Sequence, residues 1–366
     1  MGIKGDMMRV LLLGPINSKN EGFHYSDSVT PELQKAFTNI GHECNMLYGK
    51  NVSSTDFNSY HIIMLAREQY AKRWLSEYSL LTNIIFHRTS KREMFPIICA
   101  RYGNHRTISS IYANVNEFYD SWDFHFVQTL GFAKEFVCSL SNGDTAGKIC
   151  VSDMAVPSVI QKVKPIEMDS LIYMGRLRHN PSRYDFIKSV MTESNLNLKL
   201  NVFPGSFSKD DDKNKYGSDN PDNIEWLKKR LEHPNITVHP PVNWGKHWAY
   251  LMGSSYGFDL SPRFRNRGYS GGNAKLLEYM RAGLPTVTEP GTTNSNLLSL
   301  CNGGIIAKKS YCVESYCEAL EQLVGTLWNR EEIKRRVIET NSWEVRVKEM
   351  INNMSIVMDI NLNELE

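Results

Sequence analysis

The chain has 366 residues and a mass of 42.0 kDa, a length that favours two domains over one. With 41% hydrophobic and 22% charged residues, it has the composition of a globular protein that can bury a sizeable core. A formal net charge of +2 and a pI near 8.1 speak against a dedicated nucleic-acid or membrane binder, which would concentrate much more basic charge.

Cysteine usage and the apolar runs bear on the compartment. Seven cysteines are spread without the close spacing of a metal site, which indicates reduced, buried thiols in a cytosolic setting. No apolar run approaches the roughly 18 residues that span a bilayer, and the first residues, MGIKGDMM, lack the apolar core of a signal peptide. We therefore expect a cytoplasmic protein without an integral membrane segment, with peripheral binding at the inner membrane surface as an alternative.

The first half of the chain has the pattern of an open α/β domain. A buried strand at 9–13 leads through a polar loop to a helix, where Thr30-Pro31-Glu32 supplies a cap, a proline at the first helical position and an acidic first turn. Four later apolar runs are continuous more than alternating, which predicts parallel strands covered on both faces. They lie at 60–66, 96–102, 123–128 and 148–152. We predict a Rossmann-like domain over residues 1–160.

A second α/β domain follows a short linker. Residues 153–168 mix prolines with polar residues without clear periodicity, which is typical of a linker. Strand-like runs with helices between them then predict a second Rossmann-like domain over 166–345. Its five runs are SLIYMG, LNLKLNVFPG, ITVHPPV, YGFDLSP and LPTVTEP. We expect the last helix, 346–366, to pack back on the first domain.

Two successive α/β domains place the carboxyl ends of two sheets opposite each other across a cleft, and ligands bind at those ends. No G-x-G-x-x-G follows the first strand and no G-x-x-x-x-G-K-[ST] occurs, which speaks against a dehydrogenase and a P-loop nucleotidase. The triple aspartate at 210–212 lies in a polar segment, 208–223, that we interpret as a solvated loop. We therefore predict no metal site.

Arginines follow two of the predicted strands in the second domain. Gly175-Arg176 comes directly after the strand SLIYM, with Arg183 close behind, and Arg263 follows the strand YGFDL. Arginines at the carboxyl end of a strand, beside a glycine that lets backbone approach, suit a diphosphate.

The run SGGNAKLLEYMRAGLP (270–285) joins a glycine pair to a helix that stops at a Gly ahead of a Pro. A helix amino end offers unpaired N–H groups and a favourable dipole to an anion, and Gly271-Gly272 let that anion come close. Glu278, one turn further on, would repel a phosphate unless it accepted hydrogen bonds from neutral hydroxyls such as those of a ribose.

This run, extended to TVTEPG, resembles the donor-site signature of GT-B glycosyltransferases, in particular the retaining family 4 type. There a Glu, seven residues and a second Glu are followed by a pattern like A-x-G-x-P-V-V. Gly175-Arg176 resembles the family's G-R, HPNITVHPPVNW (233–244) its N-V-x-F-x-G segment, and NSWEVRVKEM its closing S-W-E helix. The resemblance covers about 165–350 and implies two facing Rossmann-like domains with a cleft between them, the first of which binds the acceptor.

The resemblance implies a nucleotide-sugar donor, with a UDP-sugar as the leading choice, and no cofactor. Glu278 would contact the ribose hydroxyls, and Arg176 with Arg183 would neutralise the diphosphate. The full set of donor-binding candidates is Arg176, Arg183, Arg263, Ser270, Gly271, Gly272, Asn273, Lys275 and Glu278. Ser270 departs from the family, because it stands where the first Glu usually holds sugar hydroxyls. The transferred sugar is therefore not readable from the pattern.

Such a site supports glycosyl transfer without a metal, because fixed cations and a helix amino end stabilise the charge that develops on the leaving diphosphate. A retaining reaction, which we favour, needs no protein nucleophile, whereas an inverting one needs a general base opposite the donor. The candidates are His24 and Asp27, after the first strand, and His105, after PIICARY.

The acceptor stays open among a growing glycan, a lipid-linked saccharide, a small metabolite and a modified DNA base. Two other classes of protein compete with a glycosyltransferase. One is a nucleotide-sugar epimerase of the same fold, and the other is a non-catalytic nucleotide-sugar-binding relative, for which Ser270 is the main argument.

Overall fold

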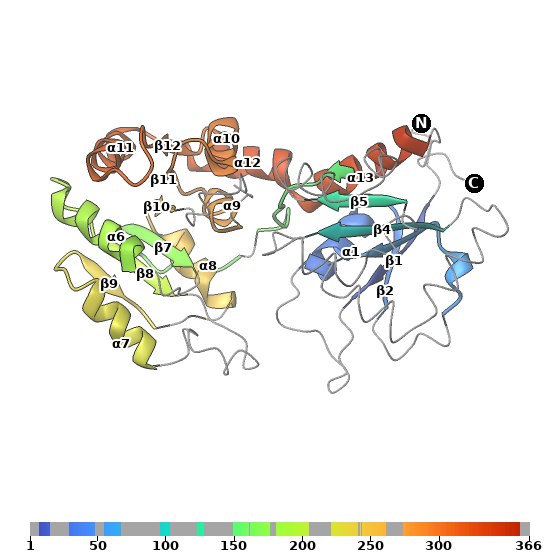
Figure 1. Cartoon of the computed structure of the whole chain (residues 1–366), viewed down its shortest axis with the longest axis horizontal. Helices are drawn as coiled ribbons and strands as arrows, with labels where there is room; N and C mark the ends of the chain where they lie inside the picture. Colours follow the sequence, from blue (N-terminus) through green and yellow to red (C-terminus); the bar gives the residue numbers. More distant parts are fainter. Residues whose placement is uncertain are drawn as a thin grey trace. The chain divides into compact units, whose positions relative to one another are not determined.

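The computed structural model describes the chain in separate stretches. These are residues 7–14, 29–47, 55–66, 96–102, 123–127, 149–160, 162–175, 181–204, 221–240, 242, 244–260 and 274–358. The chain divides into two compact units (Figure 1). The first unit comprises Met1–Met154 and Trp343–Glu366, and the second comprises Ala155–Ser342.

The first unit contains a parallel sheet with six described strands. Their order is β2-β1-β3-β4-β5-β6, a doubly wound arrangement. Every pairing is parallel, so the prediction from the continuous apolar runs is confirmed. The strands are β1 (Arg9–Leu13), β2 (Glu43–Leu47), β3 (Ile62–Leu65), β4 (Ile97–Tyr102), β5 (Phe124–Val127) and β6 (Ile149–Val151).

The edge strand β2 was not among the predicted strands. Its residues nearly alternate in burial, with Glu43 and Asn45 exposed and Cys44 and Leu47 buried. An edge strand with one open face needs no continuous apolar run, so a search for such runs does not find it.

Two helices of the first unit pack against each other. The first, α1 (Val29–Asn39), begins before Thr30, so the prediction of Thr30 as the cap is wrong; this residue is buried in the first turn. The last, α13 (Trp343–Met358), contacts α1, and Asn39 Nδ2 donates a 2.7 Å hydrogen bond to Glu344 Oε1. The final helix thus begins at residue 343 and lies in the same unit as the amino-terminal sheet.

The second unit also contains a parallel sheet with six described strands. Their order is β12-β11-β10-β7-β8-β9, so the direction of the winding reverses between β7 and β10. The strands are β7 (Leu171–Gly175), β8 (Leu200–Pro204), β9 (Ile236–Val238), β10 (Tyr256–Phe258), β11 (Thr286–Thr288) and β12 (Gly304–Ile306). The three-residue β12 was not predicted, because so short an apolar run gives no pattern.

Helices cover both faces of the second sheet. Successive strand residues point to opposite faces, so Leu171 and Tyr173 pack in one core and Ile172 in another. The first core is closed by α6, α7 and α11, and the second by α8 and α9. The helices are α6 (Pro181–Glu193), α7 (Pro221–Arg230), α8 (Trp244–Gly253), α9 (Ala274–Arg281), α10 (Thr293–Cys301) and α11 (Val313–Gly325).

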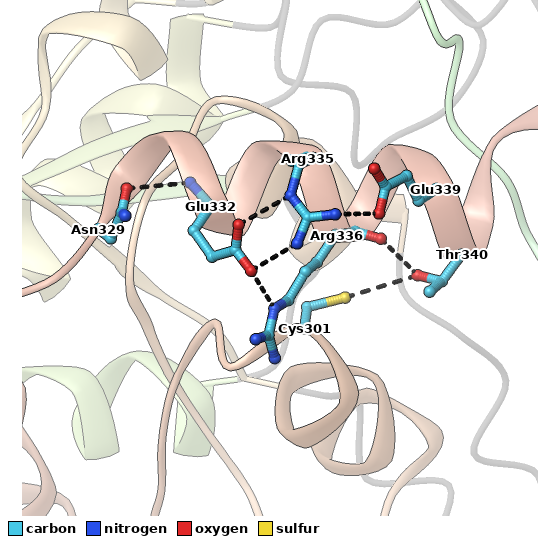
Figure 2. Close-up of polar contacts among 7 residues, drawn as sticks. All are labelled: Cys301, Asn329, Glu332, Arg335, Arg336, Glu339 and Thr340. Carbon is cyan, nitrogen blue, oxygen red and sulfur yellow. Dashed lines mark hydrogen bonds and ion pairs between the residues drawn. The ribbon is translucent and has the colours of Figure 1, made fainter.

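The helix α12 (Arg330–Asn341) packs against α9 and α10. Asn329 caps it by accepting a hydrogen bond of 3.1 Å from the backbone N–H of Glu332. Figure 2 shows the Glu332 carboxylate between Arg335 and Arg336, each of which donates to it at 2.7 Å. These contacts lie within one helix, so they support α12 itself.

Arg330 ties the start of α12 to the ends of α8 and α9. Its Nε donates to Gly283 O and its Nη1 to Ser254 O, both at 3.1 Å. The carboxyl end of a helix carries partial negative charge, so a cation there is favourable. Gly283 ends α9 with a φ of 74°, which confirms the predicted stop, and a Cβ at this position would lie 2.7 Å from Arg330 O.

Candidate functional site

The second sheet offers a ligand site where its winding reverses, because ligands of such sheets bind outside the carboxyl ends of the strands at that point. Gly175 ends β7 there, and Asp259 directly follows β10. The helix α9 adds Lys275 in its first turn. These three residues define the candidate site.

Lys275, a predicted donor ligand, is bound by the protein itself. Its Nζ lies 3.1 Å from Asp259 Oδ1 and 3.4 Å from Leu260 O, and 4.5 Å from the centre of the Tyr173 ring. The side chain of Asp259 is 0% exposed and that of Lys275 is 12% exposed. A carboxylate buried to this degree needs a compensating charge. Lys275 therefore neutralises Asp259, and any phosphate here would share the ammonium with that carboxylate.

The other oxygen of Asp259 is bound as well. Its Oδ2 accepts hydrogen bonds from Thr288 Oγ1 and Asn294 Nδ2, each at 2.8 Å. Thr288 ends β11, and Asn294 lies in the first turn of α10. Asp259 was not among the predicted site residues, although an aspartate directly after the buried strand YGF was a usable signal. Nothing in the spacing connects it with Lys275.

Gly175 has no packing partner that explains a glycine. A Cβ there would lie 3.7 Å from Tyr173 Oη and 3.8 Å from Lys275 Cδ, which are ordinary contacts. At Gly257, by contrast, a Cβ would lie 2.4 Å from Thr286 Oγ1, so packing within the unit requires that glycine. Nothing in the described stretches excludes a side chain at position 175, so its absence leaves room beside Lys275.

Arg183, a predicted diphosphate ligand, lies in the first turn of α6 and is 5% exposed. Its Nη1 lies 3.4 Å from Tyr173 Oη. Burial would lower the pKa of the guanidinium, but Tyr173 and Tyr311 beside it raise the pKa overall, so it stays charged. Its Nε finds no acceptor in the described part of the chain. Arg183 and Lys275 thus contact the same tyrosine, Arg183 at the hydroxyl of Tyr173 and Lys275 over the face of its ring.

Glu278, the predicted ribose ligand, lies on α9 three residues after Lys275. Its side chain is 14% exposed, and its Oε2 lies 3.3 Å from Arg281 Nη1. Leu276, Leu277 and Met280 form the buried face of the helix, as predicted. The carboxylate is thus held by a cation of its own helix at the border between core and solvent.

The other predicted site residues lie outside the described residues, so their positions and roles stay predictions. They are His24, Asp27, His105, Arg176, Arg263, Ser270, Gly271, Gly272 and Asn273.

The described stretches contain neither a cluster of metal-ligating side chains nor a helix suited to span a membrane. There, no three His, Cys, Asp or Glu side chains are grouped so that they could hold a metal ion. No helix in those stretches is both long and apolar enough to cross a membrane.

Comparisons with known proteins agree with the topology. No protein-family model and no curated protein matches the chain. Among solved structures, sucrose-phosphate synthase from Thermosynechococcus elongatus is similar to this chain at 10% identity and a TM-score of 0.59, and the match covers 96% of this chain and 99% of the synthase chain. Anabaena HepE, in complex with UDP and glucose, matches 95% with 100% of its own, at 10% identity and a TM-score of 0.60.

A third solved structure, the lipopolysaccharide outer core galactosyltransferase WaaB, matches 96% of this chain with 100% of its own, at 13% identity and a TM-score of 0.57. Identities this low speak for the fold alone. With its two parallel six-stranded sheets, the chain has the GT-B fold of glycosyltransferases.

Proposed function

We propose that the protein is a glycosyltransferase that moves a sugar from a nucleotide-diphosphate donor, with UDP as the leading nucleotide, to an acceptor hydroxyl. The observation that carries this proposal is the close approach of Gly175 and Lys275, in the first turn of α9, at the reversal point of the second sheet; Glu278 follows one turn further along that helix. The GT-B fold and the UDP complex of HepE add support. We assign acceptor binding to the first unit.

The donor fits this site in two parts. Its diphosphate lies at the amino end of α9, where the helix dipole favours an anion, and Gly175 leaves room for it. Its ribose hydroxyls donate to Glu278, because an ionised carboxylate is a pure acceptor. Arg176 and Arg263, which follow β7 and β10 in the sequence, complete the diphosphate contacts in this proposal.

The reaction breaks the bond between the anomeric carbon and the diphosphate oxygen, and the diphosphate leaves with the electron pair. The acceptor oxygen forms the new bond to the anomeric carbon and loses its proton. In the retaining reaction that we favour, the leaving diphosphate takes that proton, so no protein base is required. In an inverting reaction, His24, Asp27 or His105 would take it. Fixed cations supply the charge stabilisation, so the proposed reaction needs no metal.

Thermal unfolding in the presence of UDP, GDP, ADP and their sugars tests the donor site. A ligand at 100 times its Kd stabilises the native state by about 2.7 kcal/mol, which is roughly 5–11 °C for a unit of 150–250 residues. We expect this shift with UDP and UDP-sugars, and its loss in Glu278→Ala. The matched control is Glu331→Ala, since that glutamate is 81% exposed on α12 and pairs with Lys334 at the surface of the same helix.

The outcomes separate the competing functions. No shift with any nucleotide refutes the donor site. A shift with conversion of the donor into its epimer, without an acceptor, identifies an epimerase. Binding without transfer to any saccharide, lipid-linked saccharide or glycosylatable DNA base identifies a non-catalytic binding protein. The acceptor and the cytoplasmic location stay predictions from the sequence.

A further inference from the structure

Arg281 is a buried cation on the core face of α9. It is 3% exposed, although arginine is rarely buried to this degree without a specific partner. The burial of this arginine therefore has to be explained by specific partners.

Three groups hold the guanidinium of Arg281. Its Nη1 lies 3.3 Å from Glu278 Oε2, and its Nη2 donates to the carbonyl oxygen of Val159. Its Cζ lies 4.5 Å from the centre of the Trp248 ring, which is itself 1% exposed. A planar guanidinium can make these contacts together because it combines a fork of donors with a flat face that stacks on aromatic rings.

The partners of Arg281 come from three parts of the second unit. Glu278 lies one turn earlier on α9, and Trp248 lies on α8. Val159 lies in the segment that begins the second unit, a few residues after the division at Met154. The backbone of that segment is held as well, since the Val156 N–H donates a 2.9 Å hydrogen bond to Asn341 O. Arg281 is thus held by residues of α8, of α9 and of the segment around Val159.

Because Arg281 is held in this way, its ion pair with Glu278 restricts the position of the Glu278 carboxylate. A glutamate on an exposed helix face samples several rotamers and loses that freedom when it binds a ligand. The ion pair with Arg281 restricts the carboxylate before a ligand arrives. An ionised carboxylate has about four acceptor sites, and the contact with Arg281 takes up one of them.

We propose that Arg281 is a positioning residue that holds the Glu278 carboxylate in place to read the ribose of the nucleotide donor. This inference rests on the proposed function, because it assumes a nucleotide at this site. It predicts that Arg281 governs how well the protein distinguishes a ribonucleotide from a deoxyribonucleotide. A residue that only stabilised the fold would affect both nucleotides equally.

The test measures the Kd of UDP and of 2′-deoxy-UDP by titration calorimetry. One hydrogen bond from a ribose hydroxyl to a carboxylate is worth about tenfold in affinity, so wild type should bind UDP about tenfold more tightly than 2′-deoxy-UDP. Arg281→Met keeps the apolar stem but removes the charge and the donors. We expect it to weaken UDP binding and to bring the two Kd values within about twofold, while the Kd of 2′-deoxy-UDP stays nearly constant.

A second variant covers the case in which Arg281→Met does not fold. Arg281→Lys keeps the charge, but a single ammonium cannot contact Glu278, Val159 and Trp248 together, so we expect an intermediate ratio of the two Kd values. An unchanged ratio in every folded variant overturns the inference and leaves the proposed function intact. Equal weakening of both nucleotides shows a purely structural role and also overturns it. If wild type binds neither nucleotide, the proposed function fails, and this inference fails with it.

Discussion

Replacing Lys275 by methionine separates its bond to Asp259 from any bond to a donor phosphate. The change leaves the Asp259 carboxylate, which is 0% exposed, without the ammonium 3.1 Å away. Removing one partner of a buried ion pair costs about 3–5 kcal/mol of unfolding free energy. Because Thr288 and Asn294 still donate to the other oxygen, we expect the lower end, about 3 kcal/mol. For a unit of 150–250 residues this lowers Tm by roughly 6–12 °C.

The double variant Asp259→Asn with Lys275→Met removes both charges, and it should recover most of the lost stability. Calorimetry of the ligand-free protein measures Tm for both variants. The matched control is Lys308→Met, since that lysine is 72% exposed and pairs with Glu318 on the surface, where such pairs contribute little. The reasoning is refuted if Lys275→Met unfolds at the same temperature as Lys308→Met, or if the double variant is as unstable as the single one.

Three further substitutions in the second unit test which contacts stabilise it. Arg330→Met removes the two 3.1 Å hydrogen bonds to Gly283 O and Ser254 O. Chemical denaturation should therefore show a loss of about 3 kcal/mol of unfolding free energy, and a loss below about 0.5 kcal/mol would contradict a stabilising role of these bonds. Gly283→Ala places a Cβ 2.7 Å from Arg330 O at a φ of 74°, and should cost about 2 kcal/mol in the same assay. Burial lowers the pKa of His239 below 6.5, so the unfolded chain takes up its proton first and unfolding becomes easier as the pH falls below 6.5. His239→Gln should flatten this part of the pH dependence, and identical pH profiles would count against it.

The parallel strands were predictable because burial on both faces demands continuous apolar runs. The runs at 9–13, 96–102 and 123–128 became β1, β4 and β5 with small changes in their ends. The edge strand β2 and the short β12 escaped because neither is buried on both faces over enough residues to leave such a run. A continuous apolar run thus indicates a strand that is buried on both faces, and it does not detect strands at the edges of a sheet.

The polar partners in the site were harder to predict, because they depend on which strands are neighbours. Asp259 meets Lys275 only because β10 lies beside β7 and α9 packs behind them. Arg281 did leave a local signal: it lies four residues after the buried Leu277, which places it on the same face of the helix. A charged residue in the apolar stripe of a short helix indicates a buried ion pair.

The three charged residues of α9 now suggest how the helix is kept ready for a ligand. Lys275 is held by Asp259, Glu278 by Arg281, and Arg281 by Val159 and Trp248. The charge of each of these three residues is thus already compensated in the free protein. A ligand then meets side chains whose conformational entropy has been lost on folding, so less is lost on binding. Binding selectivity at this helix should therefore depend on the compensating residues as strongly as on Lys275 and Glu278 themselves.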